Sequence, residues 1–397
     1  MTQLVLVANP GSASRKYALY DDTLTERARL HVENGNGSII CTLFIGGESR
    51  VIEPLFTDLR DTARHVIQLF TDAGAVGQED TVSAIGLRIV APGEFFLQDH
   101  IVTDDVITKL EQVYHLVPLH IAASLHELQL LKESYPDVSI VGVSDSAFHT
   151  TKPNYTWNYG INIHDADRFG IKRYGYHGLS VSASVDALWN SGKLPPKVVV
   201  CHLGSGSSVS AVFHGRSIDT TMGYTPLEGV IMASRSGTID FGAVRALKTN
   251  LSMSDDQVEE YLNTQGGLLG LSGSDDIRVL LDREASGDHA AHLALATLIH
   301  SYHKAIGGMI VALNGCDLLV FTGTVGERSA ILRKRIVAHL ECLDFILDGE
   351  ANEACTGPSK MTFISQKAAS RPIVVIPADE AKRIALHTLT AISQSHA

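Results

Sequence analysis

Two arginines, one histidine and one aspartate stand in glycine- or proline-rich turns next to apolar runs. Arg88 lies in LRIVAPGE and Arg235 in MASRSG, while His177 lies in YGYHG and Asp145 in SDSAFH. Each residue alone has an ordinary explanation, such as a surface arginine, a hydrogen-bonded core histidine or a helix-capping aspartate. Together they fit phosphoryl transfer to a carboxylate. Two guanidiniums and an imidazole offset the charge of one anion attacking another, and the acid holds a metal or orients a group.

Four glycine-rich turns contain groups suited to holding phosphates, and we expect each to follow an apolar strand. They span Asn9–Ser14, Gly204–Ser208, Gly266–Gly273 and Phe321–Glu327. Such turns point backbone N–H groups and serine hydroxyls into a concavity. One such turn is most often an ordinary turn. Four of them, in a chain without the G-x-x-x-x-G-K-[ST] motif of P-loop proteins, favour a nucleotide site divided between two domains.

Other nucleotide-binding and catalytic signatures are missing from the sequence. Gly204-x-Gly206 is followed by Val209 where the dinucleotide-binding fingerprint requires a glycine, which disfavours a Rossmann site. The chain has no H-E-x-x-H, no G-x-S-x-G and no protein-kinase motif set.

The same arrangement of strand, turn and alternating segment occurs twice. Leu4–Ala8 is purely apolar, as a strand covered on both faces should be, and a second apolar run, Lys197–Cys201, begins near the middle of the chain. Each leads into a Gly/Ser turn, in which Gly11, Ser12 and Ser14 align with Gly204, Ser205 and Ser207. An internal duplication would leave such a pattern.

Strands and helical patterns alternate along the remaining chain, which predicts an α/β architecture. Val82–Val90 and Val138–Val143 are expected to be buried strands. The expected helices are Thr57–Ala73, Asp104–Val113, Ala122–Glu133, Asp255–Asn263, Asp288–Leu313, Ala330–Leu340 and Glu380–Ser393. The polar segments Asn154–Gly170 and Ser191–Pro196 are expected to be connectors. We therefore predict an N-terminal domain over 1–150 and a C-terminal domain over 151–381, with a last helix, 382–397, packing back on the first domain.

Length, composition and charge describe a folded soluble protein. The chain has 397 residues, 45% of them hydrophobic and 19% charged, and a formal net charge of −12. Nucleic-acid binders normally carry a basic field, so that class is disfavoured. Five scattered cysteines without a C-x-x-C pair favour buried reduced thiols. The start lacks a signal-peptide pattern, and the longest apolar stretch, 305–321, is too interrupted to span a membrane. We expect a cytoplasmic protein without membrane or nucleic-acid partners.

At this point the order of motifs closely resembles the acetate kinase (acetokinase) family of the actin-like, sugar-kinase superfamily, from residue 4 to about residue 388. The Asp219–Gly229 block, DTTMGYTPLEG, is the most specific match. The others are Asn9-x-Gly11-Ser12-x-Ser14-x-Lys16, Arg88-Ile89-Val90, Pro118-Leu119-His120, Asp145–His149, Tyr174–Gly178, His202-Leu203-Gly204-x-Gly206, Arg235-Ser236-Gly237-x-Ile239-Asp240, Phe321-Thr322-Gly323 through Gly326-Glu327, and Pro377-x-x-Glu380.

The resemblance implies two duplicated actin-like (ribonuclease H-like) domains around a central nucleotide cleft, and a homodimer. It implies reversible transfer of the γ-phosphoryl group of ATP to acetate, giving acetyl phosphate and ADP, by a direct in-line route with Mg²⁺ or Mn²⁺. The catalytic set would be Arg88, Asp145, His177 and Arg235. Arg88, Val90, Leu119, His120, Tyr176 and Pro226 would bind the acid. Asn9 and Glu380, with Asp145, would hold the metal.

The resemblance also implies a nucleotide-binding set in which His202 and the Gly204–Ser208 turn cradle the phosphates and two further segments receive the adenosine. Its members are Lys16, His202, Gly204, Ser205, Gly206, Ser207, Asp276, Ile277, Arg278, Gly323, Thr324, Val325, Gly326 and Glu327.

Several positions depart from the usual family pattern. Ala91-Pro92-Gly93 stands where His-Gly-Gly is usual, and Ile121-Ala122 replaces Asn-Pro after His120. Ser205 replaces an asparagine and Thr238 an aspartate, and Leu179-Ser180-Val181 follows His177-Gly178 in place of Thr-Ser-His. Because Ala91 and Ser205 flank the expected reaction centre, they allow a shifted acid or phosphate preference.

Two alternatives to an acetate kinase remain. The first is the same enzyme class with another substrate, such as propionate or a slightly larger acid, or with another phosphoryl donor. The second is a nucleotide-gated binding module like the actin-like chaperone ATPases. No appended substrate domain is visible to support that second class, and mere gating has no use for Arg88, Arg235 and His177.

Overall fold

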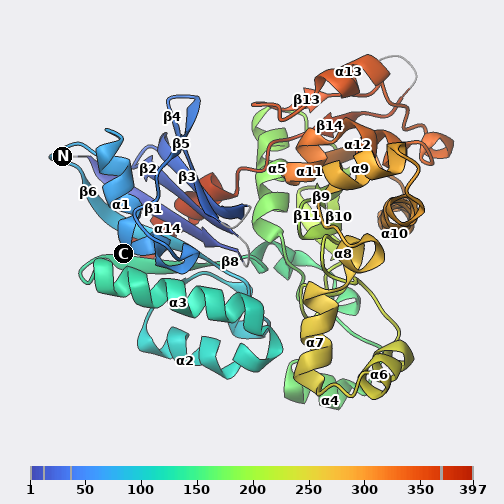
Figure 1. Ribbon diagram of the computed structural model, residues 1–397, viewed down its shortest axis with the longest axis horizontal. Coiled ribbons are helices and arrows are strands. Elements are labelled where there is room, and N and C mark those ends of the chain that lie inside the picture. Colours follow the sequence, from blue (N-terminus) through green and yellow to red (C-terminus); the bar gives the residue numbers. More distant parts are fainter. Residues whose placement is uncertain (1, 12–13, 36–37, 367–369, 396–397) are drawn as a thin grey trace. The chain divides into compact units, whose positions relative to one another are not determined.

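The computed structural model describes residues 2–11, 14–35, 38–366 and 370–395. Contacts divide the chain into two compact units (Figure 1). Unit 1 consists of Met1–Ala147 with Asp379–Ala397, and unit 2 consists of Phe148–Ala378. Ser12, part of the first expected phosphate turn, lies outside the described residues. No helix of the described ranges is both long enough and apolar enough to cross a membrane.

Unit 1 is built on one mixed sheet with the strand order β5-β4-β3-β2-β1-β6-β8-β7. β1 to β5 form an antiparallel meander, whereas β6 and β8 run parallel to β1. The strands are β1 (Gln3–Pro10), β2 (Ser14–Asp21), β3 (Glu26–Gly35), β4 (Ser38–Ile45), β5 (Glu48–Ile52), β6 (Thr81–Ile89), β7 (His100–Ile101) and β8 (Ser139–Ser144).

Helices cover both faces of this sheet. Leu4 and Leu6 belong to a core shared with α1 and α3. On the opposite face α14 approaches β6 so closely that a Cβ on Gly86 would lie 2.2 Å from Thr388 Oγ1. The helices are α1 (Thr62–Asp72), α2 (Asp104–Gln112), α3 (Pro118–Ser134) and α14 (Glu380–Ser395), with short 3-10 turns at Leu59–Asp61, Glu94–Leu97 and Tyr114–Leu116.

Unit 2 contains a second mixed sheet, with the order β11-β10-β9-β12-β14-β13. Its strands are β9 (Lys197–Leu203), β10 (Ser207–Phe213), β11 (Arg216–Thr220), β12 (Leu318–Thr322), β13 (Thr362–Phe363) and β14 (Ile373–Val375). The longest helix, α10 (His289–Ala312), packs on the face that carries Val199 and Cys201. α5 (Gly178–Asn190) packs on the other face, against Val198 and Val200.

The other helices of unit 2 are short. They are α4 (Ile163–Phe169), α6 (Phe241–Asn250), α7 (Asp255–Thr264), α8 (Gly267–Ser272), α9 (Ile277–Ala285), α11 (Gly323–Arg328), α12 (Ala330–Val337) and α13 (Gly349–Ala354). Short 3-10 turns occur at Ala147–Thr151, Asn154–Thr156 and Glu341–Leu343.

The two sheets repeat one topology. β3-β2-β1-β6-β8 in unit 1 and β11-β10-β9-β12-β14 in unit 2 have the same order, with three antiparallel strands followed by two parallel ones. β1 and β9, the first strands of the two repeats, each lead into a Gly/Ser turn. This repeat confirms the internal duplication expected from the sequence.

Some expected elements differ from the observed ones. The expected connector Asn154–Gly170 contains α4, whose N-terminus is capped by Asn162 and whose last turn ends at Gly170 with φ +62°. The glycine-rich stretch Gly266–Gly273 is not a turn after a strand, because it forms α8 directly after α7. The helix expected over Thr57–Ala73 begins only at Thr62. α3 begins at Pro118 instead of Ala122, because proline suits a helix's first position.

A buried acid beneath the β1–β2 hairpin was not expected from the sequence. Glu127 of α3 accepts a hydrogen bond from Tyr17 (Oη–Oε1, 2.6 Å) and lies 3.6 Å from Arg15 Nε. Arg15 in turn donates to the carbonyls of Gly11 and Ser14, on either side of the turn after β1. This network therefore supports the hairpin that carries Asn9.

The buried carboxyl group of Glu127 should make the free energy of unfolding of the protein depend on pH. Burial raises its pKa to about 7, although the bond from Tyr17 and the charge of Arg15 oppose the shift. The unfolded chain loses this proton at a lower pH than the folded chain, so unfolding becomes easier as pH rises from about 4.5 to 7. We expect Glu127→Gln, which cannot ionise, to gain up to about 3 kcal/mol relative to wild type across that window. Urea unfolding at pH 5, 6, 7 and 8 measures this difference, and a constant difference would contradict the assignment.

Candidate active site

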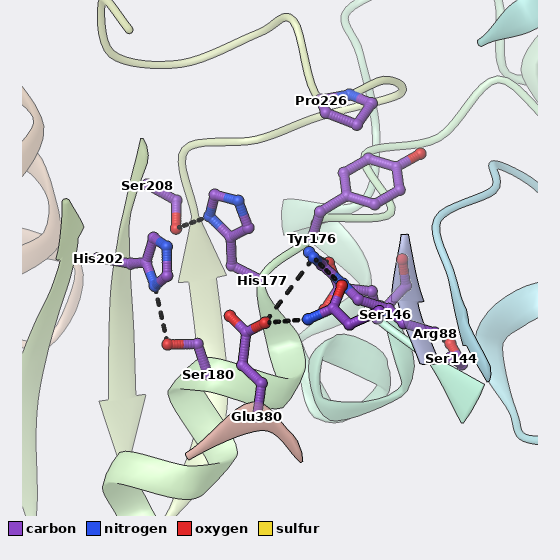
Figure 2. A network of polar contacts seen from close by, with 12 residues as sticks. Arg88, Ser144, Ser146, Tyr176, His177, Ser180, His202, Ser208, Pro226 and Glu380 are labelled. Atoms are coloured by element: carbon purple, nitrogen blue, oxygen red, sulfur yellow. Dashed lines mark hydrogen bonds and ion pairs between the residues drawn. The ribbon is translucent and has the colours of Figure 1, made fainter. Parts of the chain in front are cut away.

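The first group of predicted residues converges in unit 1 around Arg88. Its guanidinium donates to Asp145 (Nη2–Oδ2, 2.7 Å) and to Asn9 (Nη1–Oδ1, 3.2 Å). Asn9 donates to Glu380 (Nδ2–Oε2, 2.9 Å), whose carboxylate lies 3.8 Å from Arg88 Nη1. Figure 2 shows Glu380 facing the Arg88 guanidinium. The structure thus brings four predicted residues into one network.

Sheet topology explains this convergence. Asn9 lies near the end of β1, Arg88 near the end of β6, and Asp145 directly follows β8. These three strands are neighbours and run parallel, so their carboxyl ends meet at one edge of the sheet, where α/β proteins place ligands. Glu380 is the first residue of α14, where a carboxylate also complements the helix dipole.

Two neighbouring carboxylates stabilise the charge of Arg88. Burial by itself would lower the pKa of Arg88, but the charges of Asp145 and Glu380 outweigh that effect and raise the pKa. Asp145 is 1% exposed and Arg88 presents 17% of its side chain. A buried carboxylate thus holds a permanent cation that keeps one accessible edge.

The second group surrounds the β9–β10 turn of unit 2. His202 is the next-to-last residue of β9, and its Nδ1 lies 2.8 Å from Ser180 Oγ. His177 lies against it, with ring centroids 4.3 Å apart, and its Nδ1 is 3.0 Å from Ser208 Oγ (Figure 2). His177 has φ +59°, which is uncommon for a non-glycine residue, and it precedes the first residue of α5.

Gly206 in this turn is the point where an imidazole and a guanidinium meet. A Cβ placed on Gly206 would lie 3.1 Å from His177 Nε2 and 3.4 Å from Arg235 Nη1. Both cation-capable groups therefore lie against a backbone segment of the type that binds phosphate. A side chain at Gly206 would therefore require His177 to shift slightly.

Two further glycine-rich segments of unit 2 reach the same region. The N–H groups of Leu268 and Leu269 in α8 donate to the carbonyls of Met232 and Ala233, just before Arg235. Gly267 has φ +59°, and a Cβ there would lie 2.3 Å from the Met232 carbonyl. At the start of α11, a Cβ on Gly323 would lie 3.1 Å from the His202 ring. α8 thus reaches the β9–β10 turn through Ala233, whose N–H donates to the Ser205 carbonyl (3.2 Å), and α11 begins directly beside His202.

Residues predicted to bind the acid occupy varied positions. Val90, Tyr176 and Pro226 are buried, whereas Leu119 and His120 lie in the first turn of α3 with Leu119 exposed. Tyr176 donates to the Tyr224 carbonyl (2.7 Å), and Arg235 Nη1 donates to the Pro226 carbonyl (3.2 Å). The structure therefore groups Tyr176, Pro226 and Arg235 around one loop of unit 2.

The predicted nucleotide residues separate into two kinds. Gly323–Glu327 forms most of α11, and Glu327 Oε1 accepts from the backbone of Ala378 (2.9 Å). Asp276 instead caps α9 and pairs with the exposed Arg278 (2.7 Å), an arrangement that also explains both residues structurally. Ile277 is the first residue of α9.

Ser205 is exposed at the β9–β10 turn and Ser207 is buried beside it. Lys16 is exposed and pairs with Asn9 in the β1–β2 register.

One departure from the family pattern has a visible role. Thr238 stands where an aspartate is usual, and its hydroxyl oxygen accepts a hydrogen bond from the Gly229 N–H (3.1 Å) while its own N–H donates to the Gly229 carbonyl (3.0 Å). A threonine thus supplies an acceptor at this position. Ile121 is fully buried in the unit 1 core, where an apolar side chain is favoured.

Sequence reasoning missed several residues that shape the site. Arg333 is completely buried and links α11 to the end of α13. Glu228, Tyr159 and Arg173 together support the Tyr224–Gly229 loop, which precedes Arg235. Glu228 lies in the most specific motif, which was a usable signal. Arg333 and Glu127 lie in ordinary helical patterns, so only long-range contacts identify them.

The donor chemistry of the Arg88 group suits a hard cation. Within the described parts of the chain, no group of three or more His, Cys, Asp or Glu side chains is arranged to hold a metal by itself. The Arg88 group offers two carboxylates and one amide oxygen, from Asp145, Glu380 and Asn9. Oxygen ligands with room for water are what Mg²⁺ prefers.

The duplicated fold is actin-like, glycine-rich segments follow β1, β9 and β12, Arg88 lies near the end of β6, and His177 and Arg235 meet at Gly206. Together these features define a class of phosphotransferase. The family model described as the Acetokinase family matches residues 4–386. The chain belongs to the acetokinase family.

Full-length relatives agree with that membership. The chain is 35% identical over 396 residues to an acetate kinase of Carboxydothermus hydrogenoformans, covering 98% of this chain and 99% of the relative. It is 35% identical over 390 residues to a propionate kinase of Edwardsiella piscicida, covering 97% and 96%. The crystal structure of a propionate kinase from Francisella tularensis matches with a TM-score of 0.87, at 32% identity, over 98% of this chain and 99% of that one.

Proposed function

We propose that this protein transfers the γ-phosphoryl group of ATP to a short carboxylic acid, acetate first and propionate as the alternative, forming an acyl phosphate and ADP. The observation that carries the proposal is the convergence of His177 and Arg235 on the backbone of Gly206. Family membership supports it, because the relatives at about a third identity are acetate and propionate kinases.

The two arginines supply the positive charge that a reaction between a carboxylate and a phosphate requires. Arg235 and Arg88 bind the carboxylate and the transferring phosphoryl group, and so offset the repulsion between two anions. His177 donates a hydrogen bond to an equatorial phosphoryl oxygen as charge develops there. Ser208 fixes the His177 ring from its other nitrogen, which leaves Nε2 on the Gly206 side.

The step itself needs no general base. A carboxylate oxygen of the acid, already ionised at neutral pH, attacks the γ-phosphorus of ATP. A new P–O bond forms to the acid as the bond to the β-phosphate oxygen breaks, and ADP leaves with that electron pair. No protein nucleophile is required, which agrees with the absence of a cysteine or serine nucleophile from the proposed catalytic set.

Asp145, Glu380 and Asn9 would hold Mg²⁺, directly or through water. Mg²⁺ held there would neutralise part of the phosphate charge. Asp145 and Glu380 serve a second purpose within the chain, because both orient the Arg88 guanidinium. His202, Ser207, Lys16 and the β9–β10 turn bind the phosphates in this proposal, and α11 with Asp276–Arg278 receives the adenosine.

In this proposal the acid is recognised by a small apolar wall, to which the family motifs assign Val90, Leu119, Tyr176 and Pro226. Such a wall separates acids that differ by one methylene by only about 1–3 kcal/mol. We therefore propose that acetate and propionate are both accepted. A homodimer, a cytoplasmic location and two domains, 1–150 and 151–381, with the last helix packing back on the first domain, are parts of the same proposal.

The purified protein tests this proposal directly. ATP and Mg²⁺ are incubated with acetate, propionate, butyrate or formate, and the acyl phosphate is trapped with hydroxylamine. A parallel series replaces ATP with pyrophosphate, because Ser205 and Ala91 stand at positions that could change the donor. We expect hydroxamate from acetate and propionate with ATP. Protein that is folded and binds ATP but yields no hydroxamate from any acid would contradict the proposal.

A further inference from the structure

The loop Tyr224–Gly229 carries Pro226 next to Arg235, and an unassigned carboxylate braces it. Glu228 accepts from Arg173 (Nη1–Oε1, 2.6 Å) and from the Tyr159 hydroxyl. Tyr159 also accepts from the backbone N–H of Tyr224 (2.8 Å). One phenol oxygen therefore links the first residue of the loop to the carboxylate near its end.

The bracing group is packed closely. The Glu228 carboxylate lies directly over Gly223, where an added Cβ would fall 1.7 Å from Oε2 and 2.4 Å from Tyr159 Oη. The Arg173 guanidinium stacks over the Tyr159 ring at 4.5 Å from its centroid. A charged hydrogen bond and a stacked ring together restrict the rotamers of Arg173 and Tyr159, so these side chains hold the loop in one position.

The loop in turn restricts the position of the Arg235 side chain. The carbonyl of Pro226 accepts from Arg235 Nη1 (3.2 Å), and the carbonyl of Tyr224 accepts from Tyr176 (2.7 Å). The position of the Pro226 carbonyl therefore limits where the Arg235 guanidinium can lie. Because the loop is anchored by Glu228 two residues beyond Pro226, loss of that anchor would release the carbonyl.

We propose that Glu228 is a positioning residue that, with Tyr159 and Arg173, holds the Tyr224–Gly229 loop so that Pro226 fixes the Arg235 guanidinium for the carboxylate substrate. The inference rests on the proposed function, since it assigns Arg235 a role in binding the acid. It adds that the acid site depends on a carboxylate that does not itself touch the substrate.

Two variants test the role in the full-length protein. Glu228→Gln removes the charge that faces Arg173, and Tyr159→Phe removes the hydroxyl while keeping the ring under Arg173. We expect each to lower kcat/KM for acetate about tenfold or more, since a small misplacement of a catalytic group is costly. The KM for ATP should stay within about twofold of wild type. Glu284→Gln is the matched control, because Glu284 forms a similar pair with Arg335 (2.6 Å) on α9 and α12.

A double-variant cycle separates positioning from general stability. If Glu228 acts through Arg235, then adding Glu228→Gln to the Arg235→Ala variant should lower kcat/KM further by less than about twofold. Three results would overturn the inference. They are a full additional loss of kcat/KM in the Arg235→Ala background, a rise in the KM for ATP as large as the rise in the KM for acetate, and unchanged acetate kinetics in both single variants.

The cycle also distinguishes the inference from the proposed function. If Arg235→Ala is severely impaired but Glu228→Gln and Tyr159→Phe are not, only the positioning role fails. If Arg235→Ala itself retains wild-type turnover, the assigned role of Arg235 fails, and the inference fails with it.

Discussion

Replacing either active-site arginine by alanine is expected to lower kcat/KM for acetate by about 10³-fold or more, as for arginines that stabilise other phosphoryl transfers. Arg235 lies against Gly206 with His177, and Arg88 is held by Asp145 and Asn9, so both guanidiniums are oriented in advance. Acyl hydroxamate formation with ATP and Mg²⁺ measures the loss. Turnover within a few-fold of wild type in both variants would refute the mechanism.

Folding effects need to be separated from catalytic ones in this experiment. Arg88→Ala leaves Asp145 buried without its cation, which is costly in itself. Arg88→Lys keeps the charge but loses the two-pronged geometry, so it should remain folded and still be strongly impaired. Arg64→Ala and Arg335→Ala are matched controls, because each removes an arginine from a more exposed ion pair, with Glu133 and Glu284 respectively. Both controls should retain near-normal activity.

The largest effect on stability is expected at Arg333. This side chain is fully buried, and its guanidinium makes five hydrogen bonds without a carboxylate partner. Burial lowers its pKa. Its acceptors are the carbonyls of Gly326, Glu327, Asn352 and Cys355 and the side chain of Asn352. Arg333→Met would remove all five bonds, although the carbonyls of Glu327 and Asn352 also accept from the backbone N–H groups of Gly357 and Cys355. Each buried acceptor left without a donor costs about 1–3 kcal/mol.

We therefore expect Arg333→Met to lower the free energy of unfolding by about 4 kcal/mol or more, measured by urea denaturation. Because Gly326 and Glu327 belong to α11, the KM for ATP should rise more than the KM for acetate. Arg335→Ala, two residues further along α12, breaks only a partly exposed pair and should cost less than about 1 kcal/mol. An unchanged urea midpoint for Arg333→Met would show that this network does not stabilise the protein.

Sequence patterns predicted the architecture well where local signals were strong. The apolar strands β1, β6, β8 and β9 and the long helix α10 lie close to their expected positions, and the duplication is visible in both sheets. Periodicity and turn residues act over a few positions, so these elements could be inferred without tertiary information. Family motifs then placed Asn9, Arg88 and Asp145 on strands whose ends turn out to be neighbours.

Other features depend on contacts between distant residues and could not be derived from local patterns. The glycine-rich sequence of α8 predicts a turn, yet the segment is helical, and Gly267 is required by its approach to the Met232 carbonyl. The polar segment Asn154–Gly170, expected to be a connector, contains the short capped helix α4. Glu127, Glu228 and Arg333 each depend on partners from other elements, and no spacing rule predicts such pairs.

The claim that the acid is the phosphoryl acceptor can be tested with isotopically labelled acetate. The protein is incubated with ATP, Mg²⁺ and acetate carrying ¹⁸O in both carboxylate oxygens, and the product is cleaved with hydroxylamine, which attacks the acyl carbon. The proposed transfer predicts that the phosphate released carries one ¹⁸O atom, detected by its isotope shift in ³¹P NMR. Phosphate that contains no ¹⁸O would show that water, and not the carboxylate, receives the phosphoryl group, and would contradict the proposed function.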